Sequence, residues 1–315
     1  MREVKKEVVF MADKVDAFSR MDGLRADFTK VNTLSAALKI ANEATFLHRR
    51  FQHYTSVPSL VSMILGESMW LTRGDSISLD DSQESKKFGS RQEWGRTYIG
   101  CFSHFGGESA AMWRLYCKPN AFAIRVSASR ERFEDWVNNL RNIKSFEVAK
   151  MNRGYKGNQI LRVDCESVCF QDLVYLSVKG DQPREKTRAN QMYWFGDRSE
   201  IDKNLSVERR KTAVTGLVKD SEWGFELESR LLIKINDNGS PSCAKVQKIK
   251  VPLLAELIKD MSFTFSPWAN DDDRIEIKKT IECALAHIGI RHNGGKFYKS
   301  TLTGALQKWA KKSSI

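Results

Sequence analysis

The residues best placed to carry chemistry are two acidic side chains late in the chain. Residues 223–230 read Trp-Gly-Phe-Glu-Leu-Glu-Ser-Arg, and an apolar segment follows them. Successive side chains of a β-strand point to opposite faces, so Glu226, Glu228 and Arg230 would share one face. Two interpretations stay open. The carboxylates could form a surface ion-pair network with Arg230, which would contribute little to stability. Alternatively, one carboxylate could stabilise a developing cation while the other orients a nucleophile.

A second group of candidates lies at a predicted strand-to-helix junction early in the chain. The segment His53-Tyr54-Thr55-Ser56 offers an imidazole and hydroxyls that could hold a ribose and an amide through hydrogen bonds. The same residues also suit a helix N-cap at Ser56 beside an ordinary surface histidine.

A third group combines Ser103 with Trp113 and Tyr116. The i,i+3 spacing of the two aromatic residues places them on one face of a helix, where they could stack on a planar ring. An ordinary core helix has the same spacing, so both interpretations stay open.

The cysteines and histidines form no metal-binding pattern in the sequence. The 6 cysteines are scattered, the pair Cys165 and Cys169 has no second pair beside it, and the 5 histidines show no i,i+4 pairing. A structural zinc site needs four ligands at short, repeated spacings. We therefore expect reduced thiols and no metal cofactor.

Positive charge dominates the composition. The 315 residues include 51 Lys and Arg against 39 Asp and Glu, a formal net charge of +12. This excess favours RNA or DNA as a partner, with Arg209, Arg210 and Lys211 as candidate contacts. Solubilising surface charge is the alternative. No apolar run approaches the roughly 18 residues that span a bilayer, and no secretory signal opens the chain. The sequence thus predicts a soluble cytoplasmic protein without a membrane partner.

The hydrophobic pattern predicts the elements that must position these candidates. We expect helices at residues 33–50, 57–65, 108–117, 130–141, 252–260 and 271–288. We expect strands at residues 51–55, 69–72, 98–103, 121–127, 146–151, 168–178, 225–235, 245–251 and 261–266. Residues 73–96 read as a polar loop, and residues 180–213 are charged and irregular. The mixed order of helices and strands favours an α+β fold.

The order of the short motifs resembles a bacterial family, a domain of unknown function. The shared motifs are His-Tyr-Thr-Ser at 53–56, Cys-Phe-Ser at 101–103, Met-Trp-x-x-Tyr at 112–116 and Trp-x-x-Glu-x-Glu-x-Arg at 223–230. The resemblance covers roughly residues 51–270. An Asn-Asp-Pro-Phe block that is common in that family is absent from residues 73–90.

More distantly, the layout is similar to the ADP-ribosyltransferase fold, which includes bacterial toxins that modify nucleic acid. This resemblance implies a mixed sheet core of ADP-ribosyltransferase type with added helices at both termini. It implies NAD as the substrate, Glu228 as the main catalytic residue and Glu226 as its upstream partner. The NAD-binding residues that it implies are His53, Tyr54, Thr55, Ser103, Trp113 and Tyr116.

The corresponding division of the chain has three parts. Residues 1–50 would be an N-terminal helical extension, residues 51–270 the ADP-ribosyltransferase-like α+β core, and residues 271–315 a C-terminal helix and basic tail packed on that core.

The implied chemistry suits these residue types. Cleavage of the nicotinamide–ribose bond builds positive charge on the ribose, and a fixed carboxylate can stabilise that charge without a metal. The resemblance implies transfer of ADP-ribose from NAD to a macromolecule, with nucleic acid favoured by the charge. It also implies a role as a toxin or phage-defence effector, with an antitoxin or chaperone as a further partner. The alternative is a nucleic-acid-binding module without catalysis, which the net charge explains equally well. A nuclease is disfavoured because the Asp…Glu-x-Lys spacing is absent.

Overall fold

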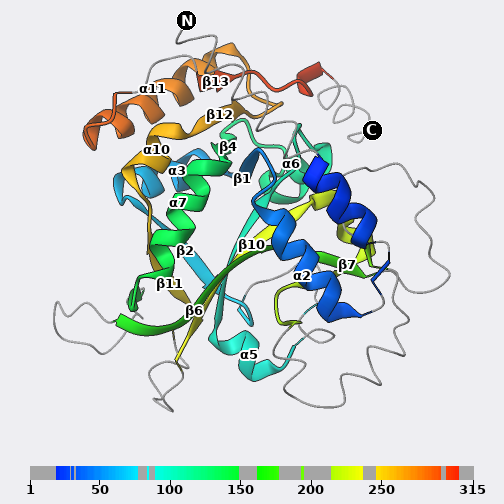
Figure 1. The fold of residues 1–315 in the computed structure, drawn as a ribbon. Coiled ribbons are helices and arrows are strands. Elements are labelled where there is room, and N and C mark those ends of the chain that lie inside the picture. Colours follow the sequence, from blue (N-terminus) through cyan, green and yellow to red (C-terminus); the bar gives the residue numbers. More distant parts are fainter. Residues whose placement is uncertain are drawn as a thin grey trace, which may run out of the picture.

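The computed structural model arranges helices around a large sheet (Figure 1). It describes residues 19–28, 30–31, 33–76, 84, 89–148, 162–176, 193–194, 214–236, 246–291 and 296–304. The strands are β1 (Arg50–Ser56), β2 (Ser68–Arg73), β3 (Thr97–Ser103), β4 (Ala123–Ser129), β5 (Ser145–Val148), β6 (Arg162–Asp172), β7 (Val174–Leu176), β8 (Tyr193–Trp194), β9 (Val218–Asp220), β10 (Glu228–Ile235), β11 (Lys248–Pro252), β12 (Ser262–Phe265) and β13 (Phe297–Tyr298). The helices are α2 (Leu34–Thr45), α3 (Val57–Leu65), α5 (Arg91–Arg96), α6 (Ala110–Cys117), α7 (Arg130–Arg141), α10 (Ala255–Asp260), α11 (Asp271–His287) and the 3₁₀ helix η1 (Ser221–Glu226).

Short polar residues begin several of the predicted helices. Ser56 caps α3 by accepting a hydrogen bond from the backbone N–H of Ser59, and Pro58 occupies the first turn. Asn270 and Asp273 form a reciprocal capping box at the start of α11. These caps satisfy backbone N–H groups that have no partner within the helix. The predicted starts of both helices are therefore confirmed.

Six strands close into an antiparallel ring. Their order is β10, β6, β5, β11, β2 and β3, and β3 pairs back with β10. β10 is paired along both edges, with Arg230 opposite Cys101 of β3 and Gln171 of β6. Every residue of β10 except Lys234 is consequently buried.

A second group of strands branches from the end of β3. β1 pairs with β3 at Gln52 opposite Ser103 and with β4 along its whole length. β12 and β13 continue this branch, and β7, β8 and β9 form a small separate sheet. The segment around His53 therefore lies beside β3 but outside the ring.

The predicted mixed sheet core of ADP-ribosyltransferase type is wrong. The chain does combine helices and strands, but every pairing in the ring is antiparallel. Among the described strands, parallel pairing is confined to β12–β13 and to the β7–β8–β9 sheet. The alternation of a strand determines which side chains share a face, but it does not determine which strand becomes the neighbour.

The helices cover the strands on two sides. In Figure 1, α7 lies on one side of β6 and β10 and α2 lies on the other. The main apolar core includes Phe133 and Trp136 of α7 together with Ile277 and Ile281 of α11. A separate apolar cluster joins α2 to Val174 and to residues 214–218. The helix of the predicted C-terminal part thus contributes directly to the main core.

Several predicted boundaries differ from the structure. The helix expected at residues 33–50 ends at Thr45, and the strand expected at residues 168–178 is divided between β6 and β7. Residues 91–96, placed in a loop by the polar composition, form α5 with Ser90 as its N-cap. The strand expected from residue 225 begins only at Glu228, because residues 221–226 form η1. Most of residues 180–213 lie outside the described residues.

Two further expectations concern the thiols and the membrane. The five cysteines within the described ranges are all free. In the same ranges, no helix has both the length and the apolar character needed to cross a lipid bilayer.

Candidate active site

Glu226 and Glu228 meet through a turn in the backbone rather than along a continuous strand. η1 ends at Glu226, and Leu227 then adopts a left-handed conformation with φ 46° and ψ 59°. This conformation costs a non-glycine residue about 1–2 kcal/mol, and such strain is concentrated at functional sites. As a result both carboxylates reach one ammonium group. Lys219 Nζ donates to Glu226 Oε2 at 2.5 Å and to Glu228 Oε2 at 3.4 Å.

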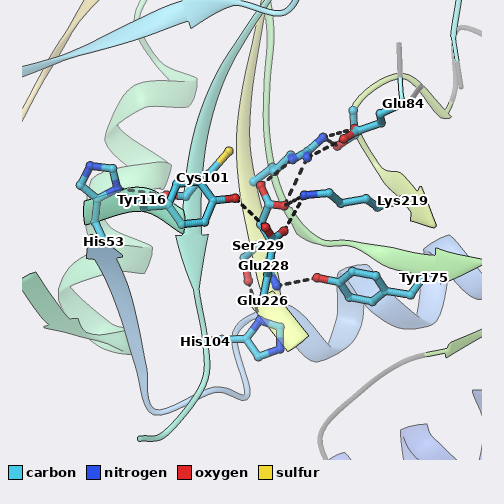
Figure 2. Close-up of polar contacts among 12 residues, drawn as sticks. His53, Glu84, Cys101, His104, Tyr116, Tyr175, Lys219, Glu226, Glu228 and Ser229 are labelled. Carbon is cyan, nitrogen blue, oxygen red and sulfur yellow. Dashed lines mark hydrogen bonds and ion pairs between the residues drawn. The ribbon is translucent and has the colours of Figure 1, made fainter. Parts of the chain in front are cut away.

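Arg230 extends this contact into a buried network of ion pairs. Its Nε donates to Glu228 Oε1 at 2.7 Å, and its Nη2 donates to Glu228 Oε2 at 3.2 Å. The same guanidinium binds both carboxylate oxygens of Glu84. Figure 2 shows Glu84, Lys219 and the two carboxylates of Glu226 and Glu228 converging at the start of β10. We call Glu84, Lys219, Glu226, Glu228 and Arg230 the carboxylate cluster.

The charges of the carboxylate cluster do not balance. Among its members, three carboxylates face two cations. Burial raises the pKa of Glu226, and repulsion from Glu228 adds to this effect, so that the pKa reaches about 7. Burial also opposes ionisation of Glu228, but Arg230 and Lys219 outweigh it and hold the pKa of Glu228 far below its ordinary value. A pair of carboxyl groups whose pKa values are pushed apart is suited to acid–base chemistry.

Aromatic side chains connect the carboxylate cluster to the surface. The hydroxyl of Tyr116, from α6, donates to Glu226 Oε1 at 2.5 Å, while the residue as a whole is 44% exposed. Burial and the charge of Glu226 raise the pKa of Tyr116, so its hydroxyl remains a donor. Lys219 Nζ lies 4.7 Å from the ring centroid of Trp223, and the ring of Phe225 lies 5.9 Å from that of Trp223. These rings offer faces on which a planar group could stack.

Two residues of β3 support the carboxylate cluster. Ser103 Oγ donates to the backbone carbonyl oxygen of Glu226 at 2.8 Å. Ser103 therefore holds the turn between the carboxylates, whereas the resemblance to the ADP-ribosyltransferase fold implies a place in the wall of an NAD pocket. Burial and the charge of Glu228 raise the pKa of the Cys101 thiol well above its ordinary value. Cys101 is consequently a neutral thiol and a poor nucleophile at neutral pH.

His53 faces away from the carboxylates. Gln52 is opposite Ser103, which is itself opposite Glu228, so these three residues share one face of the sheet. His53 follows Gln52 and points to the other face. There its ring lines a small apolar cavity, and Nδ1 lies 3.1 Å from the carbonyl oxygen of Cys101. Burial lowers the pKa of His53.

The proposed NAD-binding group is therefore divided by the sheet. Figure 2 shows His53 apart from the carboxylate pair, and Thr55, two positions further along β1, shares the face of His53. The expectation that His53 and Glu228 enclose one dinucleotide is not supported by this arrangement.

Tyr54 and Trp113 make packing contacts and hydrogen bonds within the fold. Their rings pack edge to face with centroids 5.0 Å apart, in a buried cluster. The hydroxyl of Tyr54 accepts a hydrogen bond from the backbone N–H of Ser109 at 3.3 Å, and Trp113 Nε1 donates to Glu108 Oε2 at 3.0 Å. These contacts attach α6 to β1 and thereby position Tyr116.

A second polar group lies on the opposite face of β10. Ser229 Oγ donates to Asp172 Oδ1 at 2.5 Å, and His48 Nε2 lies 2.5 Å from Asp172 Oδ2. The ring of His104 stacks on that of His48 with centroids 3.8 Å apart, and its Nδ1 lies 2.9 Å from Ser229 Oγ. We call these four residues the imidazole cluster. Figure 2 shows His104 beneath the start of β10.

The electrostatics of the imidazole cluster differ from those of the carboxylate cluster. Burial and the neighbouring His48 lower the pKa of His104 to about 3. Burial opposes ionisation of Asp172, but His48 and His104 outweigh it and lower the pKa of Asp172. Asp172 is thus an ionised carboxylate beside a neutral imidazole at neutral pH.

The sequence contained no signal for this second group. Asp172 is 124 positions from His48, and spacing rules for metal ligands or catalytic groups apply within one element or motif. The pairing of β3 and β6 with β10 brings His104 and Asp172 together, and the pairing of β1 with β3 brings the segment of His48 to them.

Arg209, Arg210 and Lys211 lie outside the described residues, so their contact with nucleic acid stays a prediction.

Comparisons with models of protein families, with curated proteins and with solved structures find no match to this chain. The resemblance to a bacterial family therefore stays a prediction, and the function has to be argued from the side chains.

Proposed function

We propose that this protein is an enzyme that transfers ADP-ribose from NAD to a macromolecular acceptor, with Glu226 and Glu228 as its catalytic residues. The main support is the separation of the two pKa values: that of Glu226 is raised to about 7, and that of Glu228 is held far below its ordinary value. Since the sheet lacks the topology expected from the ADP-ribosyltransferase resemblance, the proposal depends on the chemistry of this pair.

Glu228 would stabilise the transition state. When the C1′–N bond to nicotinamide breaks, its electron pair leaves with the nicotinamide, which departs as a neutral pyridine, and positive charge develops on the ribose. A carboxylate that is already fixed by Arg230 and Lys219 needs no reorganisation to face that charge. The carboxylate therefore favours the transition state over the bound substrate.

Glu226 would handle the proton. A hydroxyl, amine or ring nitrogen of the acceptor forms the new bond to C1′ and must lose a proton. A carboxyl group with a pKa near 7 accepts a proton efficiently at neutral pH. Glu226 is therefore the general base in this mechanism.

Substrate access involves Tyr116. Glu226 and Glu228 are only 1% and 4% exposed, and the Tyr116 hydroxyl covers Glu226. NAD has to displace this hydroxyl to reach the carboxylates. The exposed face of Tyr116, together with Trp223 and Phe225, provides a surface on which the nicotinamide or adenine ring could stack.

The chemical class of the acceptor is inferred from the net charge of the protein. A net charge of +12 concentrates polyanions at the protein surface, so we propose RNA or DNA as the acceptor. A cytoplasmic toxin or phage-defence effector, restrained by an antitoxin or chaperone, is the biological role that this reaction suits.

The second candidate is a nucleic-acid-binding module without catalysis. The same +12 charge favours it, and it predicts salt-dependent binding of RNA or DNA with no consumption of NAD.

The test compares NAD consumption by the wild-type protein and by Glu228→Gln, with RNA and DNA as acceptors. Loss of a transition-state-stabilising group is expected to lower the rate by about 10²–10³-fold or more. Glu147→Gln is the matched control, since Glu147 lies 3.8 Å from Lys250 in a half-buried surface pair.

The folded state of each variant is checked by its thermal unfolding. Full activity in folded Glu228→Gln would exclude this mechanism. Nucleic-acid binding without NAD consumption by the wild-type protein would favour the binding module.

A further inference from the structure

The imidazole cluster brings together three side chains of the type that bind transition metals. His48, His104 and Asp172 each offer one donor atom, and these atoms all lie within 4.8 Å of one another. They come from three places in the chain: the link between α2 and β1, the residue after β3, and the last residue of β6. We propose that these three side chains bind a divalent transition-metal ion, with Zn²⁺ as the best fit.

The donor set selects the class of metal. Two imidazole nitrogens and one carboxylate oxygen suit zinc and its neighbours in the first transition row, whereas calcium and magnesium prefer oxygen ligands throughout. Zn²⁺ has no geometric preference from its d electrons, so it tolerates a site built from three separate segments. Ser229 Oγ lies 2.5 Å from Asp172 Oδ1 and 2.9 Å from His104 Nδ1. Its hydroxyl, or a water molecule beside it, completes four-coordination.

Metal binding requires a different orientation of the two imidazole rings. The two imidazole rings are stacked with an angle of 6° between their planes. The lone pair of each nitrogen lies in the plane of its own ring, so parallel rings cannot direct both lone pairs to one ion. Metal binding therefore requires the rings to tilt apart about their χ2 axes.

The burial of the ligands indicates a structural role. The side chains of His48 and Asp172 are 11% and 4% exposed, and that of His104 is 5% exposed. A closed site of this kind fastens the segments that carry its ligands. The ion would tie the start of β1 to the ends of β3 and β6 beside β10. The proposal does not depend on the transferase reaction.

The first test is metal uptake by the full-length, untagged protein. After treatment with a chelator and dialysis, the protein is titrated with Zn²⁺ and, separately, with Co²⁺, whose visible absorption reports its coordination. We expect about one equivalent of each metal per chain, a Co²⁺ spectrum with nitrogen and oxygen ligands, and a Tm that increases with Zn²⁺ concentration, since a ligand that binds only the folded state stabilises it.

Variants identify the ligands. His48→Gln and His104→Gln should each weaken Zn²⁺ binding by more than about 100-fold, since even residues that merely orient a metal's ligands cost 10–100-fold. His287→Gln is the matched control, because His287 is exposed at the end of α11, and it should leave binding unchanged. His48→Gln is the milder of the two changes, since its side chain is the more exposed.

Two results would overturn the proposal. One is a wild-type protein that takes up no stoichiometric Zn²⁺ or Co²⁺. The other is a folded His48→Gln variant that binds Zn²⁺ as tightly as His287→Gln.

Discussion

The two faces of β10 carry two polar clusters of opposite character. On one face, Glu228 and Arg230 belong to the carboxylate cluster, in which full charges are paired with full charges. On the other face, Ser229 belongs to the imidazole cluster, in which one carboxylate is satisfied by hydrogen bonds. The two clusters are separated by a single strand, yet their electrostatics have little in common.

This difference shows how neighbouring buried groups acquire different chemistry. In the carboxylate cluster, burial and the excess of carboxylates over cations oppose the ionisation of Glu226, whose pKa rises to about 7. In the imidazole cluster the pKa of Asp172 is lowered and His104 remains neutral at neutral pH. The first cluster is suited to moving a proton, and the second to holding a cation.

The largest expected effect is that of Arg230→Met. It removes the guanidinium that pairs with Glu228 and Glu84, so that both buried carboxylates lose this cation and Glu228 keeps only its longer contact with Lys219. We expect a loss of about 3–5 kcal/mol in the free energy of unfolding, measured with urea. Lys259→Met is the control: Lys259 and Glu256 form a surface pair, both about half exposed, and its loss should cost less than about 1 kcal/mol. Equal losses in the two variants would show that the carboxylate cluster does not stabilise the fold.

The second effect is the pH dependence of Glu226→Gln. In the folded protein Glu226 keeps its proton up to about pH 7, whereas in the unfolded chain it loses the proton near 4.5. Between these values the folded state binds more protons, so the contribution of Glu226 to stability falls as the pH rises, and above about pH 7 the loss is complete. Glutamine removes this dependence. Relative to wild type, Glu226→Gln should therefore gain about 2–3 kcal/mol in the free energy of unfolding between pH 4.5 and pH 8.

Urea unfolding at about pH 5 and about pH 8 measures this difference. Glu147→Gln, a surface substitution of the same kind, should show almost no change between the two pH values. If the stability of Glu226→Gln depends on pH in the same way as that of the wild type, the pKa of Glu226 is not raised, and the contrast between the two clusters loses its basis.

The third effect is that of Asp172→Asn in the imidazole cluster. It is measured in the presence of a chelator, so that no metal ion contributes to stability. Asp172→Asn weakens the acceptor for Ser229 and His48. Hydrogen bonds to a charged group contribute about 1.5–3 kcal/mol, so we expect a loss of about 2 kcal/mol at neutral pH by urea unfolding. Asp271→Asn, at the exposed first turn of α11, should cost less than about 1 kcal/mol. If the two variants lose the same amount, Asp172 is not a structural anchor.

The smallest effect concerns Tyr116→Phe. This substitution removes one hydrogen bond to Glu226 and should cost about 0.5–1.5 kcal/mol in the free energy of unfolding. Because that bond lowers the pKa of Glu226, its loss should raise this pKa further. The pH at which stability levels off should then shift upward. Tyr298→Phe, on the exposed β13, should change neither quantity.

The secondary structure was largely predictable from local patterns. The predicted ranges of α3 and α7 coincide with the structure, because caps and apolar periods act within a few residues. The strand predicted from residue 225 begins only at Glu228, and the cause of this difference is local. A left-handed Leu227 is not indicated by its residue type, since leucine has no preference for that conformation.

The candidate site was partly predictable. Glu226, Glu228 and Arg230 do meet, although a turn rather than strand alternation brings Glu226 to the others. Tyr116 also joins this group. Glu84 could not be identified, because it lies far from them in the chain and belongs to a polar segment without a pattern. His53 was placed with them only by the resemblance, and the sheet separates it.

The amino-acid sequence by itself determined where helices such as α3, α7 and α11 begin, that alternate side chains within a strand share a face, and that an acidic pair precedes the long apolar strand. These properties depend on contacts within a few residues. The closing of the ring, the burial of the five charged groups of the carboxylate cluster, and the meeting of His48, His104 and Asp172 were decided by tertiary structure. Each of these requires strands distant in sequence to pair in one register, and that register is selected by the packing of the whole core.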